Sequence, residues 1–106
     1  MNVGKSASLY LTANDIVEPT TIVVERVVEK TFNKNGREEK KIVVYYEGEP
    51  RGAPLSMPQL KQLIAIFRSD ETNDWVGRKV EMYRDDDIFF DGKQVSGIRF
   101  RALSPS

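Results

Sequence analysis

The chain contains neither cysteine nor histidine, and each absence removes a common kind of chemistry. Without cysteine it forms no disulfides and no thiolate metal sites, which fits a reducing compartment, and we expect a cytoplasmic protein. Without histidine it lacks the usual zinc ligand and the commonest general base. We therefore expect a protein that is not an enzyme and that binds no metal or cofactor.

Long apolar runs and an excess charge of one sign are missing as well. No run approaches the ~20 apolar residues that cross a bilayer, and the first residues lack the apolar core of a secretory signal, so we expect no membrane partner. The 16 basic and 16 acidic residues cancel. Because nucleic-acid-binding proteins are usually basic, such a function requires the charges to segregate by face.

The composition that is present is that of one globular domain. The 106 residues are 40% hydrophobic and 30% charged, and a chain of this length can bury a single core without disulfides. We expect a partly ordered N-terminal segment at residues 1–17, with a short turn near residues 12–16, and one domain at residues 18–104.

Two stretches of the first half predict a long hairpin. Residues 20–32 are rich in Val, Ile and Thr and predict a bent strand with a β-bulge near Glu25 and Arg26. Asn35 and Gly36 form a strong turn signal, and residues 40–47 predict the partner strand. Residues 53–56 predict a short third strand, which Pro54 confines to an edge.

The second half predicts a helix and another hairpin. Residues 56–68 carry an apolar helical stripe that begins after the N-cap Ser56, and Trp75 is expected to pin this helix to the sheet. Residues 78–83 and 98–102 alternate in polarity on either side of the turn signal Asp91 and Gly92.

This order of elements predicts a mainly β fold. Strand, strand, short strand, helix, strand, strand is the order of a five-stranded OB-like Greek-key barrel with one α-helix between strands 3 and 4. The alternative is an α+β sandwich in which one helix packs on an open antiparallel sheet.

Three stretches of the chain resemble a small family of phage- and prophage-encoded proteins. They are EKKIVVYYEG (39–48), QLKQLIAIF (59–67) and DWVGRKVEMYRDDDIFFDGKQVSGIRFR (74–101), the last beginning D-W-x-G-K/R-x-V-x-x-Y and ending V-x-G-I-R-x-R. The similarity covers roughly residues 18–103. It implies an OB-like barrel in a bacterial or phage setting, near recombination or replication functions, and it carries over no catalytic residues.

Basic and aromatic side chains supply the candidate binding site. OB barrels bind single strands by stacking bases on exposed aromatic rings while Lys and Arg contact phosphates. The alternation places Tyr83, Arg99 and Arg101 on one wet face, with Tyr45 on a neighbouring strand. The hairpin tips add further candidates: Lys34, Arg37, Lys93 and Phe89. We therefore expect a non-catalytic phage-type accessory protein that binds single-stranded DNA or RNA on the barrel face.

Competing interpretations exist for each of these features. Arg99 and Arg101 are also typical of a solvated face that pairs with Glu81 across the hairpin. The partner is then another phage or host protein, bound on the same face or on an exposed sheet edge. The consecutive carboxylates at residues 85–87 resemble an oxygen-ligand site for Mg²⁺ or Ca²⁺, but consecutive strand residues point alternately outward, so an acidic solvated shoulder is favoured.

Overall fold

A computed structural model describes residues 10–103, with the side chains of Lys34 and Phe90 left out. Five strands form one antiparallel sheet: β1 (Thr20–Lys34), β2 (Arg37–Tyr46), β3 (Ala53–Pro54), β4 (Lys79–Phe90) and β5 (Lys93–Arg101). The helix α2 (Met57–Phe67) follows β3, and two short 3-10 helices, η1 (Ala13–Asp15) and η2 (Thr72–Trp75), precede β1 and β4. The predicted mainly β fold with one helix between the third and fourth strands is confirmed.

The strand order is β3-β2-β1-β4-β5, so β1 lies at the centre of the sheet. Its first residues, from Thr20 to Val23, pair with β4, and its remaining length pairs with β2. The register of the second pairing shifts between Val24 and Arg26, where the sequence predicts a β-bulge. Across the described strands the sheet is open, because no pairing joins β3 to β5, and the predicted closure into a barrel is not confirmed.

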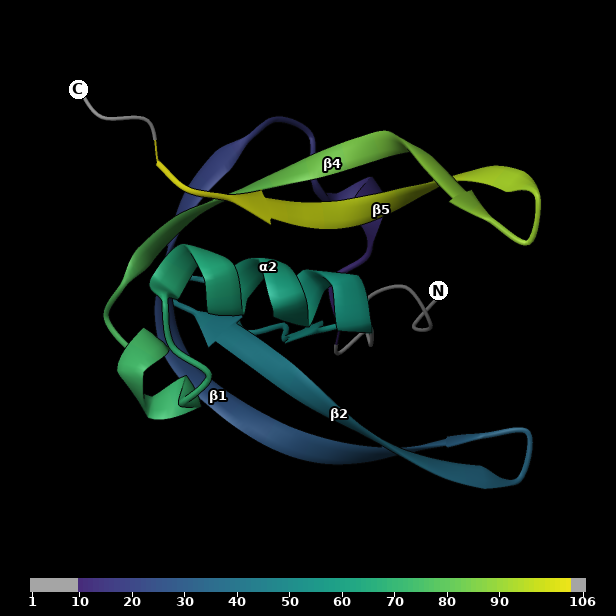
Figure 1. Ribbon diagram of the computed structural model, residues 1–106, viewed down its shortest axis with the longest axis horizontal. Coiled ribbons are helices and arrows are strands. Elements are labelled where there is room, and N and C mark those ends of the chain that lie inside the picture. The colour runs from purple at the N-terminus through teal and green to yellow at the C-terminus, as the bar shows by residue number, and fades with distance from the viewer. Residues whose placement is uncertain (1–9, 104–106) are drawn as a thin grey trace, which may run out of the picture.

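The two long hairpins enclose the helix. Figure 1 shows the β1–β2 hairpin on one side of α2 and the β4–β5 hairpin on the other. Both hairpin turns use the predicted dipeptides: Asn35 and Gly36 have φ angles of 53° and 78°, and Asp91 and Gly92 have 52° and 73°. Positive φ at both central residues is what a two-residue hairpin turn with the right-handed strand twist requires.

One core fills the space between the hairpins and the helix. Its buried residues come from every layer: Leu11, Ile16, Ile22, Val24, Val44, Ala53, Leu55, Leu63, Phe67, Trp75, Val80, Met82, Ile98 and Phe100. Trp75 is 0% exposed, its ring centroid lies 5.8 Å from that of Phe67, and its Nε1 donates to the Ser69 carbonyl at 2.9 Å. The predicted role of Trp75 in fixing the helix to the sheet is therefore confirmed.

The described part of the N-terminal segment belongs to this core. Leu11 and Ile16 are buried, and Tyr10 forms a parallel bridge with Gly52 beside β3. The predicted one-turn element near residues 12–16 is η1, which Thr12 and Asp15 close with a capping box. Residues 1–9 of the predicted segment lie outside the described residues. Within residues 10–103, no helix has the length and apolarity needed to cross a membrane.

Trp75→Ala is expected to lower the free energy of unfolding by about 3–5 kcal/mol, because it leaves a cavity between α2 and the sheet and an unpaired carbonyl at Ser69. Urea unfolding followed by circular dichroism measures this difference. The adjacent exposed Val76 supplies the control, since Val76→Ala is expected to change stability by less than about 0.5 kcal/mol. Equal effects of the two substitutions would show that Trp75 does not hold the helix.

Candidate nucleic-acid interface

The eight residues predicted to bind nucleic acid divide between the two hairpins. Tyr45, Lys34 and Arg37 belong to the β1–β2 hairpin, and Tyr83, Phe89, Lys93, Arg99 and Arg101 belong to the β4–β5 hairpin. These hairpins pair only through the first residues of β1 and β4, so their outer strands lie apart in the sheet. The structure therefore does not bring all eight residues into one groove.

Tyr45 lies under two cations. Its side chain is only 7% exposed, and the Arg26 guanidinium carbon lies 3.8 Å from the centroid of the ring. Lys30 Nζ donates to the Tyr45 hydroxyl at 2.8 Å, and this hydrogen bond raises the pKa of Lys30. At Gly52 a Cβ would lie 2.9 Å from Tyr45 Cζ, so the backbone also presses on the ring. The expectation that Tyr45 itself offers an open stacking face is therefore wrong.

The register explains which residues surround Tyr45. Arg26 lies opposite Tyr45, Val28 opposite Val43, Lys30 opposite Lys41 and Phe32 opposite Glu39. Because strand side chains alternate between faces, these pairs share one side of the hairpin, away from the core residue Val44. We call the side that carries Arg26, Lys30, Phe32, Lys41 and Tyr45 the first-hairpin face.

Positive charge gathers on the first-hairpin face. Arg26, Lys30 and Lys41 meet one carboxylate at the paired positions, that of Glu39, while the opposite side carries Glu29, Glu38 and one cation, Lys40. Aromatic side chains accompany the cations, since the Tyr10 and Phe32 rings contact edge to face with centroids 5.2 Å apart. Arg37 is exposed at the tip; the side chain of Lys34 is outside the described part of the structure. Charges that cancel over the chain therefore segregate by face on this hairpin.

The wet face of the second hairpin is a paired surface. Tyr83 lies opposite Arg99, and Glu81 lies opposite Arg101, as the alternation predicts. The Arg101 guanidinium carbon is 4.5 Å from the Tyr83 ring centroid, and Arg101 forms an ion pair with Glu81. The Tyr83 ring is thus already stacked by Arg101, and the charge of Arg101 is already paired with Glu81. Lys93 is exposed at the tip.

A second β-bulge places Phe89 on the opposite face of the hairpin from the one that unbroken alternation after Tyr83 predicts. The β4–β5 register shifts between Asp85 and Ile88, so that Phe89 pairs with Gln94 and shares the face of the buried Ile98. Phe89 lies beyond the helix and is 72% exposed. It lines a groove together with the first residues of α2.

Hydrogen bonds of the consecutive aspartates at residues 85–87 stabilise this bulge. Asp86 accepts hydrogen bonds from Arg84 Nε at 2.6 Å and from the Ser96 hydroxyl at 2.7 Å, and these lower the pKa of Asp86, the Ser96 bond most. Asp85 accepts from the Asp87 backbone at 2.9 Å. Among residues 10–103, no cluster of acidic side chains is arranged to hold a metal ion. Asp86 and Asp87 are exposed, and Asp85 is half-buried.

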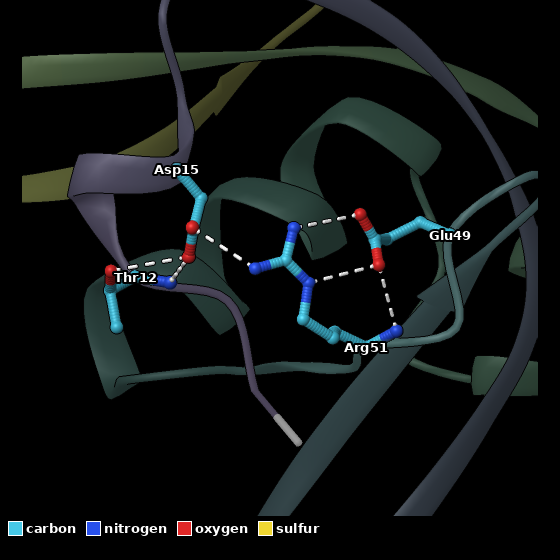
Figure 2. A network of polar contacts seen from close by, with 4 residues as sticks. All are labelled: Thr12, Asp15, Glu49 and Arg51. Carbon is cyan, nitrogen blue, oxygen red and sulfur yellow. Dashed lines mark hydrogen bonds and ion pairs between the residues drawn. The ribbon is translucent and has the colours of Figure 1, made fainter. Parts of the chain in front are cut away.

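A separate polar network fastens the N-terminal segment to the loop before β3 (Figure 2). Arg51 donates from Nη2 and Nε to Glu49 at 3.0 and 3.1 Å, and from Nη1 to Asp15 at 3.0 Å. The Thr12 backbone N–H also donates to Asp15 at 2.8 Å. The Thr12 bond is the main cause of a lowered pKa of Asp15, and Arg51 is the main cause of a lowered pKa of Glu49.

Arg26, Lys30 and Lys41 are not among the residues selected from the sequence. A signal for them exists in the turn, because a two-residue loop at Asn35 and Gly36 fixes Lys34 opposite Arg37 and thereby the whole ladder up to Arg26 and Tyr45. The charge pattern along either strand alone does not reveal the cluster.

Comparison of the chain with protein-family models, with curated proteins and with solved structures found no match. The resemblance to a phage family therefore stays a prediction.

Arg51→Met is expected to lower the thermal unfolding midpoint at neutral pH and to have a smaller effect in acid. Both carboxylates have lowered pKa values when folded, so their stabilising contribution is complete above their ordinary values of 3.8 and 4.5 and is lost as the pH falls through the lowered ones. Melting curves of both proteins between pH 7 and pH 2, a range chosen to span the carboxyl titrations, measure this convergence.

Lys61→Met is the control for this comparison, since Lys61 is an exposed cation of α2 without an ion pair to any described residue. A difference between wild type and Arg51→Met that stays constant across the pH range would contradict the assigned network.

Proposed function

We propose that this protein is a non-catalytic binding protein for single-stranded nucleic acid and that the ligand lies across the first-hairpin face. The observation that carries the proposal is the segregation of charge: Arg26, Lys30 and Lys41 lie together on one side of the hairpin beside aromatic rings. Single strands bind to such surfaces through phosphate contacts and stacked bases, without a requirement for sequence.

The stack of Arg26 on Tyr45 supplies a platform for a base. Guanidinium planes are stacking partners for unpaired bases, as aromatic rings are. Tyr45 is buried and supports the Arg26 guanidinium from below at 3.8 Å, while Arg26 is exposed. Lys30, held by the Tyr45 hydroxyl, lies opposite Lys41 on the side of this platform toward the hairpin turn, and we assign this pair of cations to the phosphates that follow the stacked base.

The position of the face agrees with an OB-type fold, which forms part of the proposal. OB folds bind oligonucleotides on the face of their second and third strands and on the loops that join strands 1 to 2 and strands 4 to 5. Here β2 contributes Lys41 and Tyr45, and the β1–β2 turn contributes Arg37. The aspartates at residues 85–87 lie on the other hairpin, where they would repel phosphate. We propose a phage-type accessory role on the sequence resemblance alone.

The expected result for labelled oligo-dT of about 15 nucleotides, a length that covers a single-domain site, is binding that weakens steeply with salt. Lys30→Gln/Lys41→Gln is expected to make the slope of log K against log salt shallower by about 1.4, since these lysines are the two proposed phosphate contacts and each contact to a single strand contributes about 0.7. Fluorescence anisotropy at several salt concentrations measures both quantities.

Arg99→Gln/Arg101→Gln removes the same charge from the second hairpin and serves as the matched control. Equal losses in the two double variants would mean that net charge alone determines binding, and a loss in the control pair only would move the ligand to the other hairpin. Either result contradicts the proposed face, as does the absence of binding at low salt.

The platform is tested separately by Arg26→Lys. This substitution keeps the charge but removes the planar group. The affinity for oligo-dT is expected to fall by about fivefold or more, as expected for the loss of about 1 kcal/mol of stacking, whereas the salt slope is expected to stay the same. An unchanged affinity would show that Arg26 acts only as a charge.

A further inference from the structure

A groove of about 320 Å³ separates the start of α2 from the β4–β5 hairpin. Its apolar lining comes from both sides: Pro58 from the helix, and Ile88, Phe89, Val95 and Ile98 from the hairpin. In Figure 1 the tip of the β4–β5 hairpin extends past the N-terminal end of α2. Phe89, two residues before the turn at Asp91 and Gly92, is 72% exposed. The groove thus begins as a continuation of the core and ends as an open apolar surface.

The outer edge of β5 forms one wall of this groove. Where α2 covers that edge, glutamine side chains take the place of a partner strand: Gln59 Nε2 donates to the Ile98 carbonyl, and the Phe100 N–H donates to Gln62 Oε1 at 3.0 Å. Backbone groups alternate in direction along a strand, so Ser96 and Gln94 present their N–H and C=O groups on the same edge. No described strand pairs with this edge of β5, and among the described residues neither glutamine of α2 bonds to the backbone of Ser96 or Gln94.

Arg99 is the one charged residue that lines the groove. It is half-buried and makes no ion pair with a described residue, unlike the neighbouring Arg84 and Arg101, which pair with Asp86 and Glu81. An occupant that brings a carboxylate to Arg99 supplies the ion pair that this side chain lacks among the described residues. An occupant that brings a second cation does not.

We infer that the free edge of β5 binds an extended peptide segment of a partner protein, with an apolar side chain in the groove and a carboxylate at Arg99. The segment adds to the sheet as a short strand, bonding to the Ser96 and Gln94 backbone groups, which is how proteins with an exposed edge commonly recognise peptides. This surface lies on the hairpin opposite to the first-hairpin face, so the inference does not depend on the nucleic-acid proposal.

Three labelled peptides that share the core Val-Thr-Phe-Thr-Val test this inference, with ends made of Asp, Ser or Lys. The acidic peptide is expected to bind most tightly and the basic one most weakly, as measured by fluorescence anisotropy. Phe89→Ala is expected to weaken all three. Arg99→Gln is expected to lower the affinity for the acidic peptide by up to about fivefold, as an exposed ion pair allows, and to leave that for the Ser peptide unchanged.

Val17→Ala provides the matched control for Phe89→Ala, because Val17 is an exposed apolar residue away from the groove. Hydrogen exchange adds a readout of strand addition: the Ser96 and Gln94 amides are expected to slow when the acidic peptide binds. The inference is overturned if none of the peptides binds saturably, if affinity does not follow their charge, or if these amides exchange unchanged. It is also overturned if oligo-dT protects the same amides and needs Arg99, since the groove would then belong to the nucleic acid.

Discussion

The backbone hydrogen bonds of β1 go to two different partners, and the arrangement of the whole sheet depends on this division. The first residues of β1 pair with β4, whereas the rest of the strand pairs with β2 after the register shift between Val24 and Arg26. A bulge increases the local twist and bends the strand that contains it. The two hairpins therefore diverge from one central strand, and α2 and the core occupy the space between them.

The division leaves edges that need protection, since an uncovered strand edge is a template for pairing with other chains. On the β3 side, the Leu11 N–H donates to the Gly52 carbonyl at 2.8 Å, and the Arg51 network holds that segment in place. On the β5 side, Gln59 and Gln62 cover the strand only as far as the helix extends. The chain thus protects parts of its edges with a segment and with side chains, and no described strand pairs with the outer edge of β5 beyond α2.

Much of the fold follows from patterns that the sequence states locally. The turn dipeptides, the alternation around Val80 and Met82, the N-cap Ser56 and the bulge near Arg26 each specify their own geometry, and each is found in the structure. Closure of the barrel is a long-range property, and a third strand of only two residues, one of them Pro54, has few backbone groups with which to pair to β5. The start of β2 also differs from the prediction: the strand begins at Arg37 rather than at residue 40. The hairpin turn extends the ladder through charged residues, which no apolar pattern marks.

The candidate site is harder to predict from the sequence than the fold, because the exposure of a strand side chain depends on which residues lie opposite it on the neighbouring strand. Tyr45 has the composition of a stacking residue, yet Arg26 and Lys30 occupy its surface. Phe89 changes sides through a bulge that three aspartates stabilise, and such a bulge has no simple sequence signature. Residue type identifies which side chains are able to bind, whereas register decides which of them are available.

The neutral net charge of the chain does not describe the local charge on each face of the two hairpins. Cations and aromatic rings share a face of the first hairpin, and the run of aspartates forms hydrogen bonds within the second. At physiological ionic strength exposed charges farther apart than about 8 Å are largely screened from one another. A bound anion therefore responds to the local set of Arg26, Lys30 and Lys41 rather than to the total. For the same reason Arg99, which lines the groove and has no ion pair to a described residue, is the local feature that selects a ligand for this groove.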